Sequence, residues 1–199
     1  PEKQAVSISL EIDSGPAFIL GALQIKGLQR YQSELLQHYA PPQIGQAYDK
    51  NLLLTFARNL QNAAYFSAVS VNLDTDIRRA DQAAVLVEVI ERRPRDLGVG
   101  AGFSSNTGVR AELSFRERNF LKRAWDLRAA LRLEQKRRLA YLENFFPPTV
   151  DGYKDAIGVL QDRSDIEGLQ VTRTSLGLKR QSTRGKLEQT LGVNLLHEK

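Results

Sequence analysis

The sequence offers few side chains that could catalyse a reaction or bind a metal. It contains two histidines, His38 and His197, and no cysteine. Neither histidine has a second histidine or an acidic residue at ligand spacing, so a metal site is not expected. Without cysteine there are no disulfides, thiolate zinc sites or cysteine nucleophiles, and no serine lies in a G-x-S-x-G motif. We therefore predict a protein that is not an enzyme and carries no cofactor.

One glycine-rich segment partly resembles a phosphate-binding loop. Gly98, Gly100 and Gly102 alternate with other residues, but the G-x-G-x-x-G spacing is missing and no helix pattern follows. We interpret the segment as a glycine-rich strand with all three glycines on one face. Glycines weaken a strand, so its edge would be compliant.

The charge pattern argues against a nucleic-acid-binding protein. The chain has 199 residues and a net charge of +5, and all of the excess lies in residues 96–199, with 18 Lys/Arg against 13 Asp/Glu. Acids and bases are interleaved there, whereas a nucleic-acid binder would show a contiguous basic stripe. A KH domain needs a G-x-x-G turn between its helices, and this chain has Ala40-Pro41-Pro42-Gln43 instead.

Residues 1–94 read as a mixed α/β unit. Alternating patterns predict strands over 6–12, 18–25, 65–73 and 83–91, and a short helix is expected over 31–39. Asp49 is a plausible N-cap for a longer helix, whose apolar stripe is Leu52, Leu53, Phe56, Leu60 and Ala63 or Ala64. The order after the first strand is β-α-α-β-β. The pattern leaves parallel and antiparallel pairing both open.

After Arg92-Arg93-Pro94-Arg95 the pattern changes to short segments with a period of two. Seven strands are expected, at about 97–104, 108–117, 124–134, 138–146, 153–162, 168–180 and 186–196. In the second and third strands, apolar and polar residues clearly take opposite faces. The faces of the strands at 138–146, 153–162 and 168–180 stay unassigned.

Periodicity does not say which face lies inside. A soluble barrel or sandwich would bury the apolar face and could bind an apolar ligand. An outer-membrane barrel would turn that face to lipid. Three observations favour the membrane: strands of about 10 residues, aromatic residues near strand ends, and a polar face rich in charge.

Three segments resemble a known family. Residues 8–27 resemble the boundary between consecutive POTRA domains, and 98–110 resemble the opening of the barrel in the BamA/TamA superfamily of outer-membrane assembly proteins. Residues 117–125 resemble its first periplasmic turn, with Lys122 and Ala124 where glycines are common. The Ser-x-Asn-Thr-Gly hairpin at 104–108 is closer to the TamA-like branch than to the BamA-like branch.

The resemblance implies an α+β POTRA domain followed by antiparallel transmembrane β-barrel strands. Residues 1–15 would be the last strand of a preceding POTRA domain, 16–94 a POTRA domain and 95–199 the N-terminal part of a barrel. Family barrels have sixteen strands, so these seven would leave the barrel incomplete. The family's R-G-[FY] loop motif is absent. Because the chain begins at Pro1 without an initiator methionine, we expect a processed or excised segment.

The resemblance also implies a function in the bacterial outer membrane, with the POTRA domain in the periplasm. The protein would receive unfolded β-rich clients at POTRA sheet edges and help to insert them at a weak barrel seam. Expected partners are unfolded outer-membrane proteins, a TamB-type periplasmic subunit and outer-membrane lipid. A two-partner secretion translocase is a close variant.

The site residues follow from this implication. The first strand of a lateral gate would include Gly98, Gly100, Gly102 and Phe103. Lipid-facing positions would be Val109, Ala111, Leu113, Phe115, Trp125, Leu127, Leu131 and Leu133. Lumen-facing positions would be Arg110, Glu112, Arg116, Asp126, Arg128 and Arg132. Lys136-Arg137-Arg138 would lie at an outward turn, either touching lipid headgroups or solvated.

Overall fold

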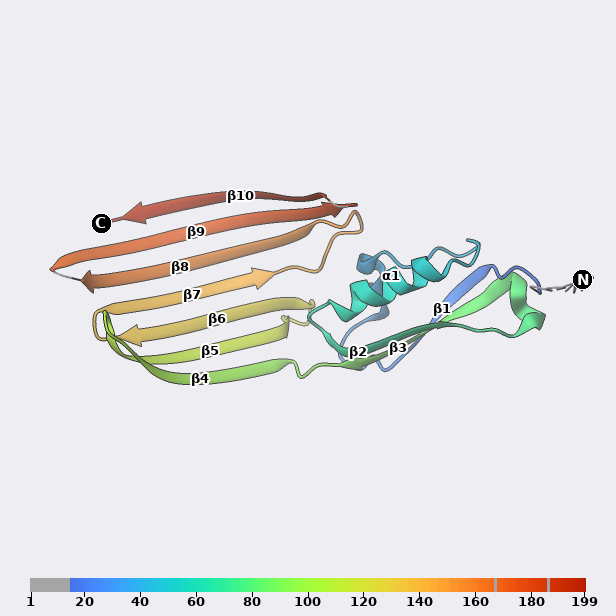
Figure 1. The fold of residues 1–199 in the computed structure, drawn as a ribbon, viewed down its shortest axis with the longest axis horizontal. Coiled ribbons are helices and arrows are strands. Elements are labelled where there is room, and N and C mark those ends of the chain that lie inside the picture. Colours follow the sequence, from blue (N-terminus) through green and yellow to red (C-terminus); the bar gives the residue numbers. More distant parts are fainter. Residues whose placement is uncertain (1–14, 167, 186) are drawn as a thin grey trace, which may run out of the picture.

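A computed structural model describes residues 15–166, 168–185 and 187–199. The chain forms two units joined near Pro94, which we call the α/β unit and the seven-stranded sheet (Figure 1). The strand predicted at 6–12 lies outside the described residues.

The α/β unit follows the predicted order. It contains β1 (Leu20–Lys26), the 3₁₀ helix η1 (Ser33–Tyr39), α1 (Lys50–Gln61), β2 (Phe66–Leu73), the 3₁₀ helix η2 (Ile77–Gln82) and β3 (Ala83–Glu91). The sheet order is β1-β3-β2, with β1 parallel and β2 antiparallel to β3. The structure thereby decides the pairing that the sequence left open.

Helix α1 begins where the sequence predicts. The carboxylate of Asp49 accepts a 2.8 Å hydrogen bond from the backbone N–H of Asn51, which satisfies one of the free donors of the first turn. The buried stripe of α1 is Leu53, Phe56 and Leu60. It packs on the face of β3 formed by alternate, fully buried valines, so neither element leaves its apolar surface in water.

The predicted helix at 31–39 is instead the 3₁₀ helix η1. It still supplies two buried leucines, Leu35 and Leu36, to the core. It ends at Ala40, whose φ of 53° is left-handed and which precedes Pro41. A residue before proline is disfavoured in the right-handed helical region, which explains the stop.

The second unit is one antiparallel sheet in chain order. Its strands are β4 (Arg95–Ser104), β5 (Gly108–Phe120), β6 (Trp125–Glu134), β7 (Arg137–Phe145), β8 (Lys154–Ile166), β9 (Leu169–Arg184) and β10 (Leu187–Glu198). All seven predicted strands are present. The largest differences are at C-terminal ends, where β8 and β9 run four residues further than expected.

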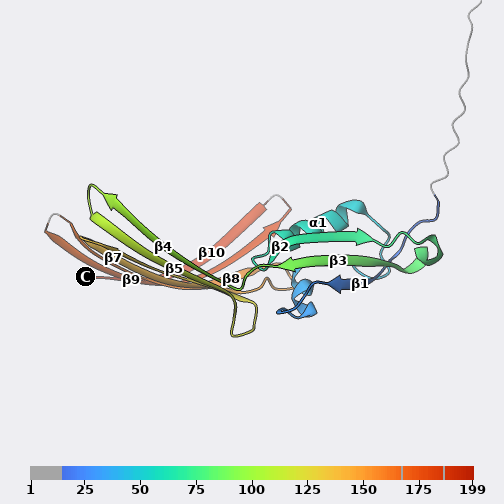
Figure 2. The ribbon, with the colours of Figure 1, turned by 90° about the horizontal axis from the view of Figure 1, so that it is seen from below.

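The seven-stranded sheet is bent into a trough (Figure 2). Its outer strands, β4 and β10, rise on the side on which α1 lies. No described strand pairs with the outer edge of either. Among the described residues, no helix combines the length and the apolar character needed to span a membrane.

Candidate functional site

The two faces of the seven-stranded sheet have opposite chemistry. Cross-strand partners place one apolar residue from every strand in a single row: Leu97, Phe115, Ala129, Leu142, Val159, Leu176 and Leu195. The neighbouring row on the other face is polar or glycine: Asp96, Arg116, Arg128, Glu143, Gly158, Gly177 and Asn194. The register thus assigns the faces of β7, β8 and β9, which the sequence left open.

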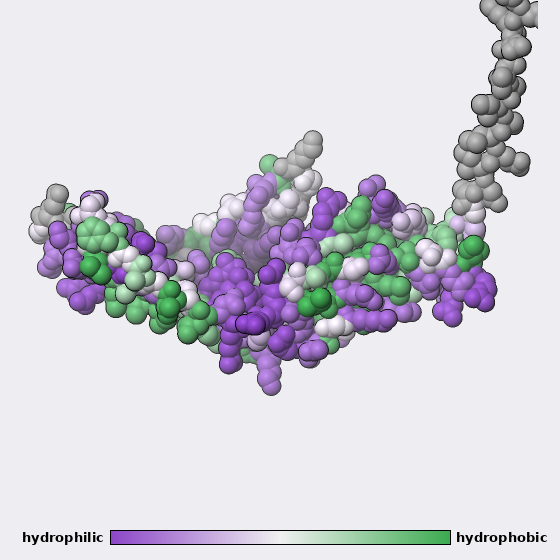
Figure 3. All heavy atoms as spheres, turned by 60° about the horizontal axis from the view of Figure 1, so that its bottom comes forward, coloured by the Kyte–Doolittle hydropathy of each residue, from purple (hydrophilic) through white to green (hydrophobic). Residues whose placement is uncertain are grey.

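Burial on this sheet is the reverse of that in a soluble protein. The apolar residues Val109, Leu113, Leu131 and Leu133 are exposed, whereas the charged residues between them are half-buried. The apolar face is the convex one, and apolar side chains gather along it in the space-filling view (Figure 3). Monomeric soluble proteins rarely expose an apolar patch of this extent.

The structure places the predicted positions as follows. The eight expected on the lipid side share the convex face: Val109, Ala111, Leu113, Phe115, Trp125, Leu127, Leu131 and Leu133. The six expected on the lumen side share the concave face: Arg110, Glu112, Arg116, Asp126, Arg128 and Arg132.

Ion pairs join the charged residues of the concave face. Asp126, which is 2% exposed, accepts hydrogen bonds from Arg116 at 2.7 and 2.8 Å and from Arg128 at 2.8 Å. Glu112 and Arg132 pair at 3.0 Å. Because Asp126 and Glu112 have arginine partners, this part of the concave face is both polar and ordered.

Aromatic and cationic side chains gather at the end of the sheet nearest the α/β unit. The rings of Trp125 and Phe146 meet edge to face with centroids 5.0 Å apart. The guanidinium of Arg123 lies 5.6 Å from the Trp125 ring centroid, and that of Arg180 lies 5.2 Å from the Tyr153 ring centroid. Such pairs suit a boundary between apolar and aqueous surroundings.

Strand β4, which carries the three glycines, lies at one edge of the seven-stranded sheet. Gly98, Gly100 and Gly102 share its concave face, and Phe103 on the convex face is 77% exposed. A Cβ at Gly100 would meet nothing closer than Glu112 Cβ at 3.8 Å, an ordinary contact. Space therefore does not require glycine at this position.

The small sheet has two edges that differ in access. At β1, the backbone of residues 45–48 covers the start of the edge, since Leu20 N–H donates to Gln46 O at 2.8 Å and Tyr48 N–H to Phe18 O at 2.9 Å. No described strand covers β2. In the small sheet, the longest row of backbone N–H and C=O groups without a covering segment is therefore the outer edge of β2.

The α/β unit forms hydrogen bonds with the turn between β5 and β6. The hydroxyl of Tyr65 donates a 2.6 Å hydrogen bond to the carbonyl of Ala124, and the Asn119 amide donates to Arg30 O at 3.3 Å. Within the turn, Lys122 and Ala124 have φ values of 59° and 53°. These left-handed conformations favour glycine, so each costs a non-glycine residue about 1 kcal/mol.

The segment Arg92-Arg93-Pro94-Arg95, which we call the linker, makes specific hydrogen bonds. Arg92 Nε donates to the carbonyl of Phe66 at 2.7 Å. Arg118 of β5 donates through its guanidinium to Arg93 O at 2.9 Å and through its backbone N–H to Pro94 O at 2.8 Å. The linker is therefore bound to both units.

Glu91 organises the loop before η1. Its carboxylate accepts hydrogen bonds from the backbone N–H of Gln29 and Arg30 and from Arg30 Nε, at 2.8 to 2.9 Å. Burial opposes ionisation, but these donors together lower the pKa of Glu91 below its ordinary value. Next to it, burial and the charge of Glu91 raise the pKa of Tyr31 to about 12.

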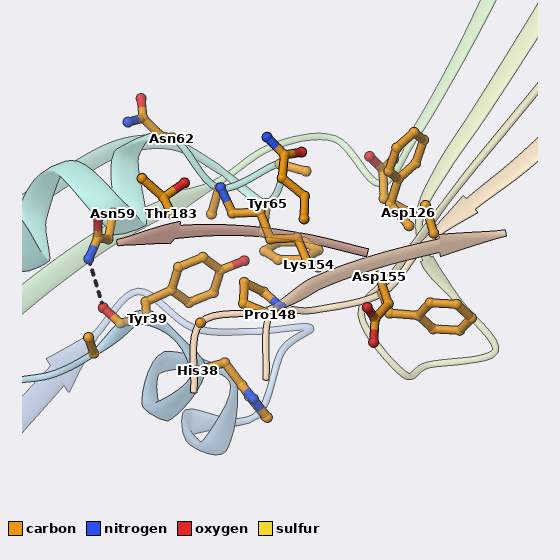
Figure 4. Close-up of a pocket in the computed structure, with 18 of the residues that line it drawn as sticks. His38, Tyr39, Asn59, Asn62, Tyr65, Asp126, Pro148, Lys154, Asp155 and Thr183 are labelled. Atoms are coloured by element: carbon orange, nitrogen blue, oxygen red, sulfur yellow. Dashed lines mark hydrogen bonds between the residues drawn. The ribbon is translucent and has the colours of Figure 1, made fainter. Parts of the chain in front are cut away.

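A cavity of about 460 Å³ lies where the two units meet. Tyr39 and Tyr65 of the α/β unit line it together with Asp126 and Lys154 of the sheet (Figure 4). The Asn59 side chain donates to the carbonyl of Tyr39 at 3.1 Å and so ties α1 to η1 at the rim. The sequence gives no signal for this cavity because its walls come from segments far apart in the chain.

The structure also describes the predicted basic turn and the arrangement of side chains that could bind a metal. Arg137 of the predicted outward basic turn pairs with Asp162 at 2.7 Å. In the described part of the chain, no group of three or more His, Asp or Glu side chains is arranged to hold a metal ion.

The fold is similar to the solved structures of BamA and CdiB. BamA from Haemophilus ducreyi lacking POTRA domains 1–3 matches with a TM-score of 0.71 and 16% sequence identity, over 94% of this chain and 36% of that chain. CdiB from Acinetobacter baumannii matches with a TM-score of 0.58 and 14% identity, over 92% of this chain and 38% of that chain. No family model and no curated protein sequence matches.

These similarities confirm the predicted fold class. A POTRA-like α/β unit is followed by seven antiparallel strands that resemble part of a barrel. The chain spans little more than a third of the BamA and CdiB chains that it matches.

Proposed function

We propose that this chain is part of an outer-membrane protein assembly or translocation factor of the BamA/TamA superfamily. The observation that carries the proposal is the exposed apolar row crossing all seven strands, with paired charges on the opposite face. The similarity to BamA over 94% of the chain supports it. The role is non-enzymatic.

In this proposal the convex face contacts lipid and the concave face lines the lumen. Strands of 9 to 16 residues are long enough to cross a bilayer at a tilt. The aromatic and cationic side chains around Trp125 then lie at the periplasmic interface. Residues 16–94 form the periplasmic POTRA domain and 95–199 the first part of the barrel.

Clients meet two strand edges in turn. The outer edge of β2 accepts an unfolded, β-rich client by main-chain hydrogen bonding, which depends little on sequence. The glycine-rich β4, with Gly98, Gly100, Gly102 and Phe103, then forms the opening side of the lateral gate. Its weak packing lets it exchange partners.

Within the superfamily we favour the TamA-like branch. The support is the short Ser-x-Asn-Thr-Gly hairpin between β4 and β5. A TamB-type periplasmic subunit would then be the partner of the periplasmic side. The secretion translocase variant shares the same gate and lipid face.

The decisive experiment compares two glycine variants of the full-length protein in client assembly. Gly100→Val stiffens β4 without a steric conflict, and we expect assembly to slow several-fold. Gly177→Val is the matched control, because Gly177 shares the concave face but lies in β9, between two strands. Equal assembly by both variants and the wild type would refute the gate.

A second measurement separates the proposal from a soluble module that encloses an apolar ligand. The membrane protein stays monodisperse only in detergent or lipid, because its convex face is apolar. A monodisperse protein in plain buffer would favour the soluble module.

A further inference from the structure

The cavity between the two units has an unbalanced charge. Lys154 of β8 and Lys179 of β9 line it, and neither makes an ion pair with any described residue. The acids of the lining are already neutralised: Asp126 pairs with arginines of β5 and β6, and Asp155 pairs with Arg180 at 2.7 Å. Two lysine ammonium groups are therefore left without a counter-ion.

The strand register holds these lysines close together. Lys154 is paired with Gln181 and Ala156 with Lys179, so the lysines are diagonal neighbours on the concave face. Diagonal neighbours in an antiparallel pair are about 7–8 Å apart, within reach of long side chains, so the two like charges repel each other. An anion between them would remove that repulsion.

The opposite wall adds hydrogen-bonding and apolar groups. His38 Nδ1 is buried without a hydrogen-bond partner within the described structure. Asn62 of the α1 C-cap and the aromatic residues Tyr39 and Phe145 also line the cavity. A small inorganic anion would use only the charges, whereas a peptide could also contact the rings.

We propose that this cavity binds carboxylate side chains of an extended acidic polypeptide segment as it passes between the α/β unit and the concave face. The ligand identity rests on the proposed function, since a client polypeptide supplies the segment. The volume of about 460 Å³ lies within the range of about 300–1,000 Å³ typical of ligand sites. Lys154 and Lys179 provide the charge recognition.

The test uses the full-length protein in lipid nanodiscs and a short fluorescent peptide in which glutamate alternates with serine and phenylalanine. A matched peptide carries glutamine in place of glutamate. We expect the wild type to bind the acidic peptide at least about tenfold more tightly by fluorescence anisotropy. The double variant Lys154→Gln, Lys179→Gln should lose most of this preference.

The matched control is Lys50→Gln, Lys136→Gln, which removes the same charge from exposed sites outside the cavity and should keep the preference. The reversal Lys154→Glu, Lys179→Glu should favour a lysine-containing peptide, which also shows that the variant is folded. An unchanged preference in the Lys154→Gln, Lys179→Gln protein would overturn the proposal. So would full displacement of the acidic peptide by millimolar phosphate, which would make the site one for free anions.

The two measurements together distinguish failure of the cavity proposal from failure of the proposed function. Equal binding of acidic and neutral peptides, with client assembly still sensitive to Gly100→Val, would refute the cavity proposal alone. Binding of neither peptide, with assembly insensitive to Gly100→Val, would refute the proposed function as well.

Discussion

The hydroxyl of Tyr65 donates a 2.6 Å hydrogen bond to the carbonyl of Ala124, 59 residues later in the chain. Tyr65 is 3% exposed, and Ala124 packs against the core of the α/β unit. Burial raises the pKa of Tyr65, so the phenol keeps its proton and remains a donor. This contact makes the turn between β5 and β6 part of the core of the preceding unit.

Replacing Tyr65 by phenylalanine should loosen this junction. The change leaves the Ala124 carbonyl without its donor, and we expect a loss of about 1–3 kcal/mol in the free energy of unfolding. Amides of residues 121–125 should exchange hydrogen faster. Tyr48→Phe is the control, because the exposed Tyr48 hydroxyl makes no hydrogen bond to the described residues. Unaltered exchange in Tyr65→Phe would show that packing alone holds the turn.

Acid should weaken the α/β unit through Glu91. Its pKa is lowered in the folded state, so its contribution to stability is present above the ordinary glutamate pKa of about 4.3 and is lost as pH falls through the folded value. The melting temperature of the wild type should drop below about pH 4 more steeply than that of Glu91→Gln. Glu88→Gln, exposed on the same strand, should follow the wild type. Parallel curves for all three proteins would exclude Glu91 as the cause.

The ion pairs of Asp126 and of Glu112 on the concave face should contribute differently to the free energy of unfolding. Asp126→Asn leaves Arg116 and Arg128 without their shared carboxylate in a half-buried setting, and we expect a loss of about 2 kcal/mol. Glu112→Gln breaks a pair whose side chains are both about one-third exposed, so the loss should stay below about 1 kcal/mol. Urea unfolding followed by fluorescence of Trp125, the single tryptophan, measures both. A larger loss for Glu112→Gln would contradict the ranking by burial.

A charge on the convex face separates a lipid-facing from a water-facing surface. Leu131 is already 41% exposed, so Leu131→Arg would change stability by no more than about 0.5 kcal/mol in a soluble protein. If this position faces lipid at mid-membrane, the same substitution should lower the free energy of unfolding by about 2–4 kcal/mol. Unfolding from lipid vesicles measures the difference. Ile90→Arg, on an exposed position of the α/β unit, should be neutral in either case.

Local sequence signals predicted the elements well in segments where a single pattern was clear. The alternation of apolar and polar residues over 108–134 was sufficient to predict strands β5 and β6 and the residues on each of their faces. Side-chain direction follows from the strand backbone itself. Asp49 likewise predicted the start of α1, because capping involves neighbouring residues only. The short helix expected at 31–39 is present as the 3₁₀ helix η1, a type that the pattern did not specify.

In β7 to β9 the alternation was too weak to assign faces. Gly158 and Gly177 stand on the concave face, and Thr174 shares the convex face with Leu176. Small and hydroxyl side chains do not distinguish the two faces by polarity. Cross-strand register resolves them, because a shift of one residue would move every side chain to the other face.

The sequence by itself determined the element order and the two-faced character of the second half, because each depends on neighbours within a few residues. The tertiary structure decided the parallel pairing of β1 with β3, the bond from Tyr65 to Ala124, the role of Glu91 and the cavity that holds Lys154 and Lys179. These features join residues that are tens of positions apart. Only the folded chain brings them within hydrogen-bonding distance, so no local pattern could reveal them.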